Sequence, residues 1–211
     1  MIAMQSRLIC HAIGLAPATE ASVRDVFIRW GFQFARHEHV EAFANSADIT
    51  HAGCVLARME EPTALLNMLE SAGSPLTTLV VLDHADTRRC VNAMRHGAAD
   101  ILELPADMVL LPTAIEGACA LSLQRQQRLS ETTAAQRRLA QLTDGECEVL
   151  QLMLHGKVNK NIASRLGIAL RTVEARRKRV FTKMGTRSLA EIAAVLQTSG
   201  LLAATSLVSL N

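Results

Sequence analysis

The 211-residue chain has few aromatic side chains: it contains no tyrosine, one tryptophan and five phenylalanines. Proteins that hold single-stranded nucleic acid without sequence preference stack its bases on aromatic rings. The scarcity of such rings argues against that kind of binding.

Long hydrophobic runs and targeting signals are also missing. No apolar stretch approaches the roughly 18 residues of a membrane-spanning helix, and residues 1–7 lack the basic-then-apolar pattern of a signal peptide. The cysteines are odd in number and include no C-x-x-C pair. We therefore expect a cytoplasmic protein with no membrane partner. Its cysteines are expected to be buried free thiols: Cys10, Cys54, Cys90, Cys119 and Cys147.

The chain carries no pattern typical of an enzyme. It has no phosphate-binding loop and no Ser/His/Asp or Cys/His arrangement for nucleophilic catalysis. His11, His51, His84 and Asp83 lie at expected strand ends on the same rim of the sheet, where a metal site or a pH-sensitive pocket is conceivable. Scattered histidines are, however, more often ordinary core or surface residues than metal ligands. We expect no enzymatic activity, no cofactor and no metal.

Lysine is absent from residues 1–120, which carry 8 arginines against 14 aspartates and glutamates. Residues 121–211 carry 14 lysines and arginines against 6 acidic residues. The length suits two small domains. A basic C-terminal part beside an acidic front half indicates that only the C-terminal part binds a polyanion.

The front half alternates short apolar runs with helical patterns. Helices are expected near residues 20–30, 39–46, 62–72 and 86–96. This alternation predicts a doubly wound, flavodoxin-like α/β domain with a parallel five-stranded sheet and helices on both faces. The expected strands are Arg7–Ile13, Phe32–Arg36, Gly53–Leu56, Thr78–Leu82 and Asp100–Leu104.

One long helix, or two nearly continuous helices, are expected over residues 108–141, where no strong helix breaker follows Pro112 and good helix formers dominate. Its later part, Gln124–Leu139, is polar, which fits a solvated spacer helix or, less strongly, a short dimeric coiled coil. The first part of the long helix should pack on the sheet through Leu111, Ile115, Ala118 and Leu121.

The apolar stretch Leu201–Leu210 suits a short extra helix that packs on the last domain or on a partner chain.

Residues 142–198 have the pattern of four short helices. Thr143 and Glu146 form a capping box for the first, which carries one apolar face. Asn159 is expected to cap the second helix, and Ser188 the fourth. The third begins at Leu170 or Arg171, and its apolar side is formed by Val173, Val180, Phe181 and Met184.

The opposite side of the third helix is strongly cationic. Six lysines and arginines stand between Arg171 and Lys183 against one acid, Glu174. A charged helix face is usually just solvated. Here, however, each cation that neutralises a phosphate would add salt-dependent affinity, and the outer stripe at the helix start is placed to read bases in a major groove.

These residues resemble the LuxR-type helix-turn-helix domain, in the version found in NarL/FixJ-type response regulators. The resemblance implies an all-α four-helix domain on double-stranded DNA, with the third helix in the major groove and the fourth pairing two subunits into a homodimer. The matching motifs are Leu142-Thr143-x-x-Glu146, Asn159-Lys160-x-Ile162-Ala163, Arg171-Thr172-Val173-Glu174 and Lys183-Met184.

The resemblance also assigns roles by position. It implies that Glu174, Ala175 and Lys178 face bases, while Asn159, Lys160, Thr172 and Arg176 lie near phosphates. Two positions depart from the family: Ala169 replaces a serine that often caps the recognition helix, which costs about 1 kcal/mol, and Arg176 replaces a common histidine. The full expected DNA-binding set is Asn159, Lys160, Arg171, Thr172, Glu174, Ala175, Arg176, Lys178, Arg179 and Lys183.

The front half resembles the receiver domain of response regulators, chiefly through residues 93–105, where a Gly-Ala turn precedes a strand that ends at a proline. A working receiver needs an aspartate that accepts phosphate, two acids that hold Mg²⁺, a lysine, and a threonine or serine. Alignment through Pro62 puts Arg58 at the acceptor position, and a shift of one residue puts Ala57 there. Leu82 stands at the Thr position, and Leu104 at the Lys position before Pro105.

The first strand also ends without an acidic pair, and Glu20 is the nearest carboxylate. We therefore expect a degenerate pseudo-receiver. Arg58 is interpreted either as a fixed cation where phosphate and Mg²⁺ would sit or as an exposed loop arginine. The bond before Pro105 is one that can be cis.

The expected protein is a sequence-specific transcriptional regulator controlled by dimerisation, a protein partner or a small ligand, without phosphorylation. The alternatives are a protein-interaction adaptor and a one-component small-molecule sensor. The expected division is a pseudo-receiver at 1–120, a linker helix at 121–141, a DNA-binding domain at 142–200 and an apolar tail at 201–211.

Overall fold

The computed structural model describes residues 8–58, 62–84 and 86–202. The chain divides into two compact units, Met1–Gln127 and Arg128–Asn211. Among the described residues, no helix is both long enough and apolar enough to cross a bilayer. The domain boundaries expected from the sequence, at residues 120, 141 and 200, stay predictions.

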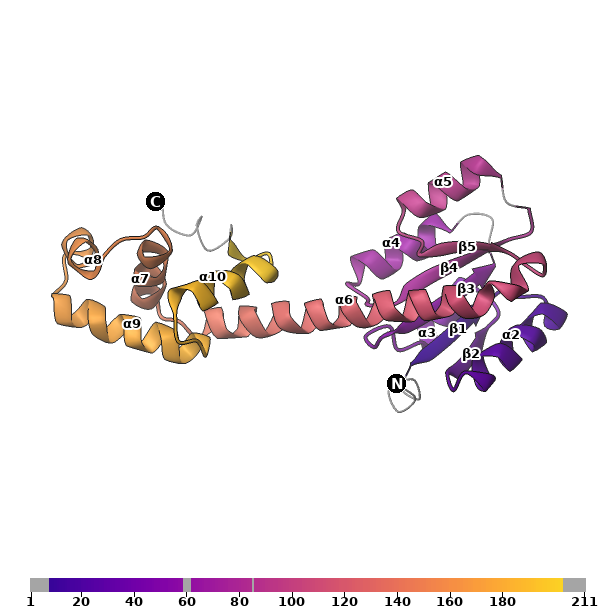
Figure 1. Cartoon of the computed structure of the whole chain (residues 1–211), viewed down its shortest axis with the longest axis horizontal. Helices are drawn as coiled ribbons and strands as arrows, with labels where there is room; N and C mark the ends of the chain where they lie inside the picture. Colours follow the sequence, from indigo (N-terminus) through magenta and orange to yellow (C-terminus); the bar gives the residue numbers. More distant parts are fainter. Residues whose placement is uncertain (1–7, 59–61, 85, 203–211) are drawn as a thin grey trace. The chain divides into compact units, whose positions relative to one another are not determined.

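The first unit contains a five-stranded sheet in the order β2-β1-β3-β4-β5, with every neighbouring pair parallel (Figure 1). The doubly wound α/β fold expected from the strand–helix alternation is confirmed. The strands are β1 (Ile9–Ile13), β2 (Gln33–His37), β3 (Gly53–Arg58), β4 (Thr77–Leu82) and β5 (Asp100–Glu103).

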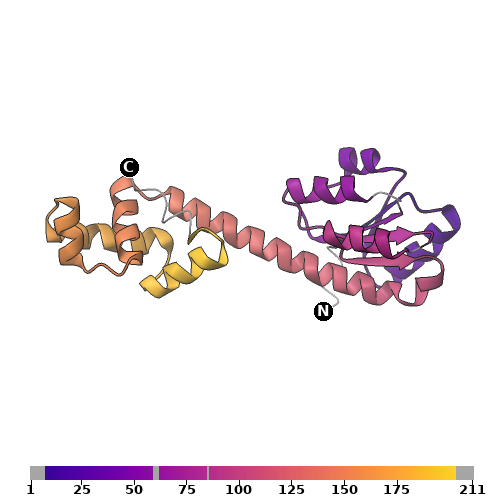
Figure 2. The ribbon, with the colours of Figure 1, turned by 90° about the horizontal axis from the view of Figure 1, so that it is seen from above.

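Helices cover both faces of this sheet. Alternate strand side chains such as Cys10 and Leu56 pack against α2 (Pro17–Arg29) and the first half of α6 (Leu111–Ala140). The intervening positions, such as Val55 and Val80, pack against the remaining helices. Figure 2 shows α3 and α6 on opposite sides of the sheet. The remaining helices are α3 (Val40–Ser46), α4 (Thr63–Ser71) and α5 (Thr87–Arg95), and the short 3-10 helix η1 (Ala106–Val109) precedes α6.

Two sequence expectations about buried residues are wrong in part. Leu121 does not pack on the sheet, since its side chain is 45% exposed. Ser122 is buried instead, because it continues the helical spacing of Leu111, Ile115 and Ala118. Its hydroxyl accepts the Gly53 amide at 2.9 Å and donates to the Pro75 carbonyl at 2.7 Å. All five cysteines are free, but only Cys10, Cys54 and Cys119 are buried, while Cys90 and Cys147 are half-exposed.

The second unit is all-α and has the expected four helices after the end of α6: α7 (Asp144–Leu154), α8 (Asn159–Leu166), α9 (Leu170–Met184) and α10 (Leu189–Thr198). Leu142, Leu150 and Val180 belong to one apolar cluster, and Val149, Ile162 and Val173 to another. Both clusters lie on the inner side of α9. Leu201 and Leu202 pack against the first cluster, and residues 203–211 of the expected tail lie outside the described part of the chain.

Candidate nucleic-acid interface

The four helices of the second unit begin in two different ways. The Glu146 carboxylate accepts the Thr143 amide at 2.9 Å, as the expected capping box requires. Ser188 caps α10, since its hydroxyl accepts the Glu191 amide at 3.2 Å. By contrast, α8 begins after Val158 and α9 after Ala169, and no described side chain caps either helix.

The expectation that Asn159 caps α8 is therefore wrong. Val158 is the N-cap residue, and Asn159 is already the first residue of the helix. The N-cap lies one residue earlier than expected. Gly156 turns the chain with a φ of 72°, and Val158 is the last residue with an extended backbone before the helix begins. Gly167 closes α8 in the left-handed conformation with a φ of 64°.

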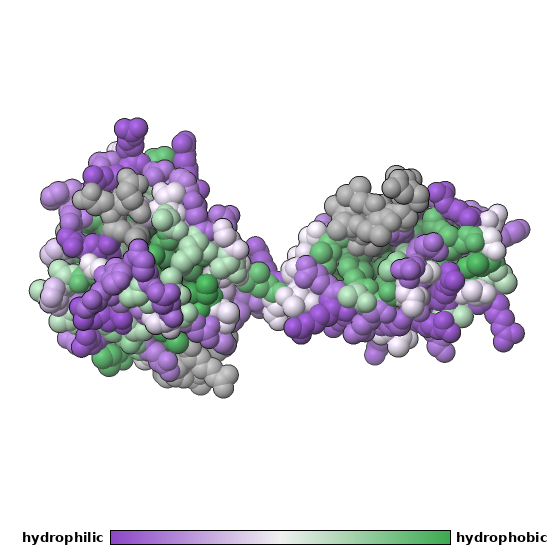
Figure 3. All heavy atoms as spheres, turned by 180° about the vertical axis from the view of Figure 1, so that it is seen from behind, coloured by the Kyte–Doolittle hydropathy of each residue, from purple (hydrophilic) through white to green (hydrophobic). Residues whose placement is uncertain are grey.

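The outer side of α9 exposes the residues expected to meet DNA. It turns its apolar side chains inward, where Val173, Val180 and Met184 are fully buried. Figure 3 shows hydrophilic residues along the edge of this unit that carries the helix. The exposed members of the expected set on this helix are Arg171, Thr172, Glu174, Ala175, Lys178 and Arg179.

Arg176 is held against the start of α7. Its Nη1 donates to the Gly145 carbonyl at 3.3 Å and lies 4.0 Å from a carboxylate oxygen of Glu148. A Cβ on Gly145 would come within 2.5 Å of the Arg176 Cζ, so glycine is the residue that leaves room for the guanidinium. Arg176 thus lies beside the exposed stripe, with its guanidinium against the start of α7.

Lys183 is set apart from the other expected DNA-binding residues. Its Nζ donates to the Glu146 carboxylate at 2.6 Å and to the Gln141 carbonyl at 2.9 Å. The Glu146 side chain is only 3% exposed, and Lys183 holds the pKa of that carboxyl below its usual range. This ammonium group therefore joins α9 to α7 within the unit.

Asn159 and Lys160 meet the middle of α9 along an open groove. One part of the groove is lined by Asn159, Glu174 and Lys178, and an adjoining part by Lys157 and Lys160. Arg177 lines both parts, and Arg187 extends the first. The expected set omits Lys157, Arg177 and Arg187. The sequence does place Arg177 among the cations that flank the outer stripe of the third helix. Lys157 and Arg187 lie in turns whose direction the sequence does not predict.

In the first unit, Arg58 lies at the end of β3 and makes two hydrogen bonds to the Asp83 carboxylate. Its Nε donates to one Asp83 oxygen at 2.8 Å and its Nη2 to the other at 2.6 Å. This bidentate pair lowers the pKa of Asp83. Arg58 is thus an exposed residue at the end of a strand, and Asp83 holds its guanidinium. Whether it replaces phosphate and Mg²⁺ stays a prediction.

The other expected receiver positions are apolar or occupied by ion pairs. Leu82 and Leu104 are buried, and the bond between Leu104 and Pro105 is cis. Glu20 is buried near the end of β1, where its carboxylate pairs with Arg24 at 2.6 Å and Arg36 at 2.8 Å. His51 lies before the start of β3, whereas Asp83 follows the end of β4, so the two residues lie at opposite edges of the parallel sheet. His51 pairs with Asp48 at 2.8 Å.

Comparison with known proteins gives consistent matches for both units. Residues 140–196 match the family of bacterial regulatory proteins of the luxR family. The transcriptional regulatory protein FixJ of Azorhizobium caulinodans is 31% identical over 193 residues, covering 90% of this chain and 92% of FixJ. The C4-dicarboxylate transport transcriptional regulatory protein DctR of Rhodobacter capsulatus is 37% identical over 191 residues, covering 82% of this chain and 93% of DctR.

Solved structures of response regulators are similar along nearly the whole chain. The response regulator StyR is 26% identical with a TM-score of 0.77, covering 90% of this chain and 98% of StyR. Full-length FixJ from B. japonicum is 27% identical with a TM-score of 0.53, covering 93% of this chain and 98% of FixJ.

Proposed function

Because this chain belongs to the FixJ-type transcriptional response regulators with a LuxR-type DNA-binding domain, we propose that it reads its DNA sites through the exposed side of α9. In this proposal Glu174, Ala175 and Lys178 face bases in the major groove. Phosphate contacts come from Asn159, Lys160, Arg171, Thr172, Arg176 and Arg179. The protein acts as a homodimer in the cytoplasm.

One observation carries this assignment: exposed cations on α9 flank a stripe that is itself exposed among the described residues of the second unit. Lys178 and Arg179 are exposed, whereas Lys183 is engaged by Glu146. We therefore place Lys183 among the residues that orient α9, and we add Arg177 and Arg187 to the candidate phosphate contacts because they line the groove beside it.

We propose in addition that the first unit is not switched by phosphorylation. Arg58 at the end of β3 cannot form an acyl phosphate, and its guanidinium is paired with Asp83. Leu104 cannot neutralise a phosphoryl group as a lysine would. Control then comes from dimerisation, from a protein partner or from a small ligand bound to the first unit.

Two experiments test these proposals. Mobility shifts with genomic fragments at two salt concentrations should show a fragment that is bound more tightly than random DNA, with affinity that falls as salt rises. If no fragment exceeds random DNA, an adaptor role replaces the DNA-reading role. Separately, incubation with Mg²⁺ and acetyl phosphate should leave the intact mass unchanged. A stoichiometric, base-labile phosphoryl group on an aspartate would contradict the pseudo-receiver assignment.

A further inference from the structure

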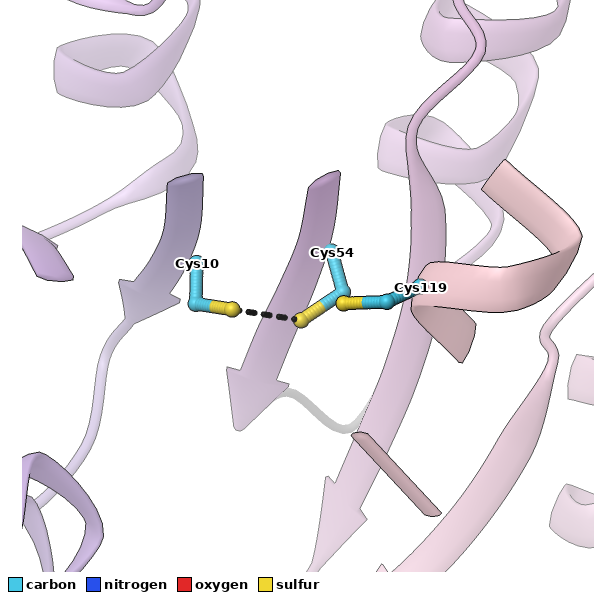
Figure 4. A group of neighbouring side chains, drawn as sticks. All are labelled: Cys10, Cys54 and Cys119. Atoms are coloured by element: carbon cyan, nitrogen blue, oxygen red, sulfur yellow. Dashed lines mark hydrogen bonds between the residues drawn. The ribbon is translucent and has the colours of Figure 1, made fainter. Parts of the chain in front are cut away.

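Three cysteine side chains converge in the core of the first unit. Cys10 comes from β1, Cys54 from β3 and Cys119 from α6, and their sulfur atoms all lie within 4.8 Å of one another. Cys54 Sγ donates to Cys10 Sγ at 3.1 Å. Cys10 and Cys54 stand directly opposite each other in the register of the two strands. Figure 4 shows the side chains of Cys10 and Cys119 pointing toward Cys54 from either side, with a dashed line for the contact between Cys54 and Cys10.

The surroundings of this cluster are apolar. Cys10 and Cys54 are 0% exposed and Cys119 is 4% exposed, and all three belong to the cluster that also contains Leu56, Leu79 and Ile115. Among the described residues, no histidine, aspartate or glutamate joins the group as a fourth ligand. The site therefore offers three sulfur atoms and little else.

This donor set selects the kind of ion that could bind. Zinc in structural sites takes four ligands, and Mg²⁺ or Ca²⁺ takes oxygen. Three thiolates around a monovalent or divalent soft ion would leave net negative charge in an apolar core, which is strongly unfavourable. Three thiolates around a trivalent soft centre form a neutral complex.

We propose that Cys10, Cys54 and Cys119 form a binding site for trivalent arsenic, taken up as arsenite. Neutral As(OH)₃ meets three thiols, three As–O bonds break and three As–S bonds form. Each thiol proton leaves with a displaced hydroxide as water, so three waters are released. Arsenic stays in the +3 state and no electrons are transferred. Reactant and product are both neutral, which suits the apolar surroundings.

Cys119 is the thiol of the three that lies nearest to solvent. It is 4% exposed, whereas Cys10 and Cys54 are 0% exposed. Cys119 is therefore the sulfur that would bind first, and Cys10 and Cys54 would complete the site.

Bound arsenic would connect α6 to two strands of the sheet through covalent As–S bonds. Since α6 runs from Leu111 to Ala140 and Leu139 packs in the second unit, the site lies on the helix shared by both units. Use of the site as the small-ligand input to DNA binding rests on the proposed function. The binding of arsenic itself does not.

The test uses the full chain, reduced with a phosphine, incubated with arsenite and examined by native mass spectrometry. We expect one arsenic per chain with the loss of three hydrogens. Cys119→Ser, Cys10→Ala and Cys54→Ala should each abolish this species. The matched controls Cys90→Ser and Cys147→Ser, which change the two half-exposed cysteines, should retain it.

A measurement on the unmodified protein covers the case in which a core variant does not fold. X-ray absorption at the arsenic edge should show three sulfur neighbours. Two sulfur neighbours, retention of arsenic in folded Cys119→Ser, no uptake by the wild-type protein, or formation of a disulfide only would each overturn the site. Mobility shifts with and without arsenite then test the regulatory use, and an unchanged shift with arsenic bound would contradict that use alone.

Discussion

Lys183 Nζ lies 2.6 Å from Glu146 Oε2, so that the last turn of α9 is joined to the first turn of α7. The pair is 37 residues apart in the sequence. The same carboxylate accepts the Thr143 amide. One glutamate therefore caps α7 and fixes the end of the helix that we propose reads DNA.

Removal of Lys183 should destabilise the second unit. Lys183→Ala leaves the carboxylate, which is 3% exposed, without its cation, and the loss of a hydrogen bond to a charged group costs about 2 kcal/mol. Hydrogen exchange of the α9 amides measures the effect, and Lys178→Ala, at an exposed position, is the matched control. Because Lys183 lowers the pKa of Glu146, this stabilisation is present above about pH 4.3 and is lost as the pH falls further. Equal protection in both variants would contradict the role.

Gly145→Ala should disturb Arg176 without changing its charge. Alanine favours the helix by about 1 kcal/mol, but its Cβ would lie 2.5 Å from the Arg176 Cζ and displace the guanidinium from the Gly145 carbonyl. We expect stability within about 1 kcal/mol of wild type and weaker binding to all DNA sequences. Adding Arg176→Ala to Gly145→Ala should cause no further loss of DNA affinity. If the losses of affinity from the two changes simply add, Gly145→Ala does not act through Arg176.

Lys178 and Arg171 should differ in what they contribute to DNA binding. Lys178→Ala should relax base preference by about 1–3 kcal/mol at one position, while Arg171→Ala should weaken all sequences alike and reduce the salt slope by about 1. Affinities for an operator and its single-base variants at several salt concentrations distinguish the two. Arg137→Ala, an exposed position on α6, is the control of equal charge. An equal loss across sequences for Lys178→Ala would contradict its assigned contact.

Restoring an acid at the end of β3 should not restore phosphorylation. We expect Arg58→Asp to remain unmodified by Mg²⁺ and acetyl phosphate, because β1 provides no acidic pair and Leu104 stands where a lysine is needed. The intact mass reports the outcome, with a receiver that has its phospho-acceptor aspartate as the positive control. Stoichiometric phosphorylation of Arg58→Asp would show that position 58 alone blocks the chemistry.

Acid should destabilise the first unit through His11. Burial lowers the pKa of His11 to about 4, helped by the charge of His37 and opposed by Asp48. Since the folded state holds His11 neutral while the unfolded state protonates near 6.5, stability should fall as the pH drops from about 6.5 to about 4, by up to about 3 kcal/mol. Urea titrations followed by the fluorescence of Trp30 measure this. His11→Phe should flatten the dependence and exposed His84→Gln should not.

Much of the fold follows from local patterns. Strand–helix alternation predicts the parallel sheet, and Thr143 and Ser188 mark the starts of α7 and α10 because their side chains cap within a few residues. The expectation for Asn159 is wrong because a cap depends on which residue of the turn is last extended. Leu121 is exposed because Ser122, and not Leu121, continues the helical spacing of the residues that face the sheet.

The parts that sequence reasoning missed depend on distant contacts. The cationic side of α9 suggests a DNA surface, but the partner of Lys183 lies on another helix, and only the packing of α7 on α9 brings it near. The three cysteines come from β1, β3 and α6, whose register and docking are set by the whole apolar core. Arg58 and Asp83 meet because Arg58 ends β3, Asp83 follows β4, and these two strands are neighbours in the sheet.

Two helices of the second unit leave first-turn amides available to an anion. Among the described residues, the first-turn amides of α8 and α9 have no side-chain acceptor, unlike those of α7 and α10. On the proposed function, phosphate oxygens would satisfy them, because helix N-termini favour anions. Part of the stability of this unit is then supplied by its ligand, so bound DNA should raise its melting temperature. Ala169→Ser would stabilise the free protein, and it should make the rise in melting temperature on DNA binding smaller.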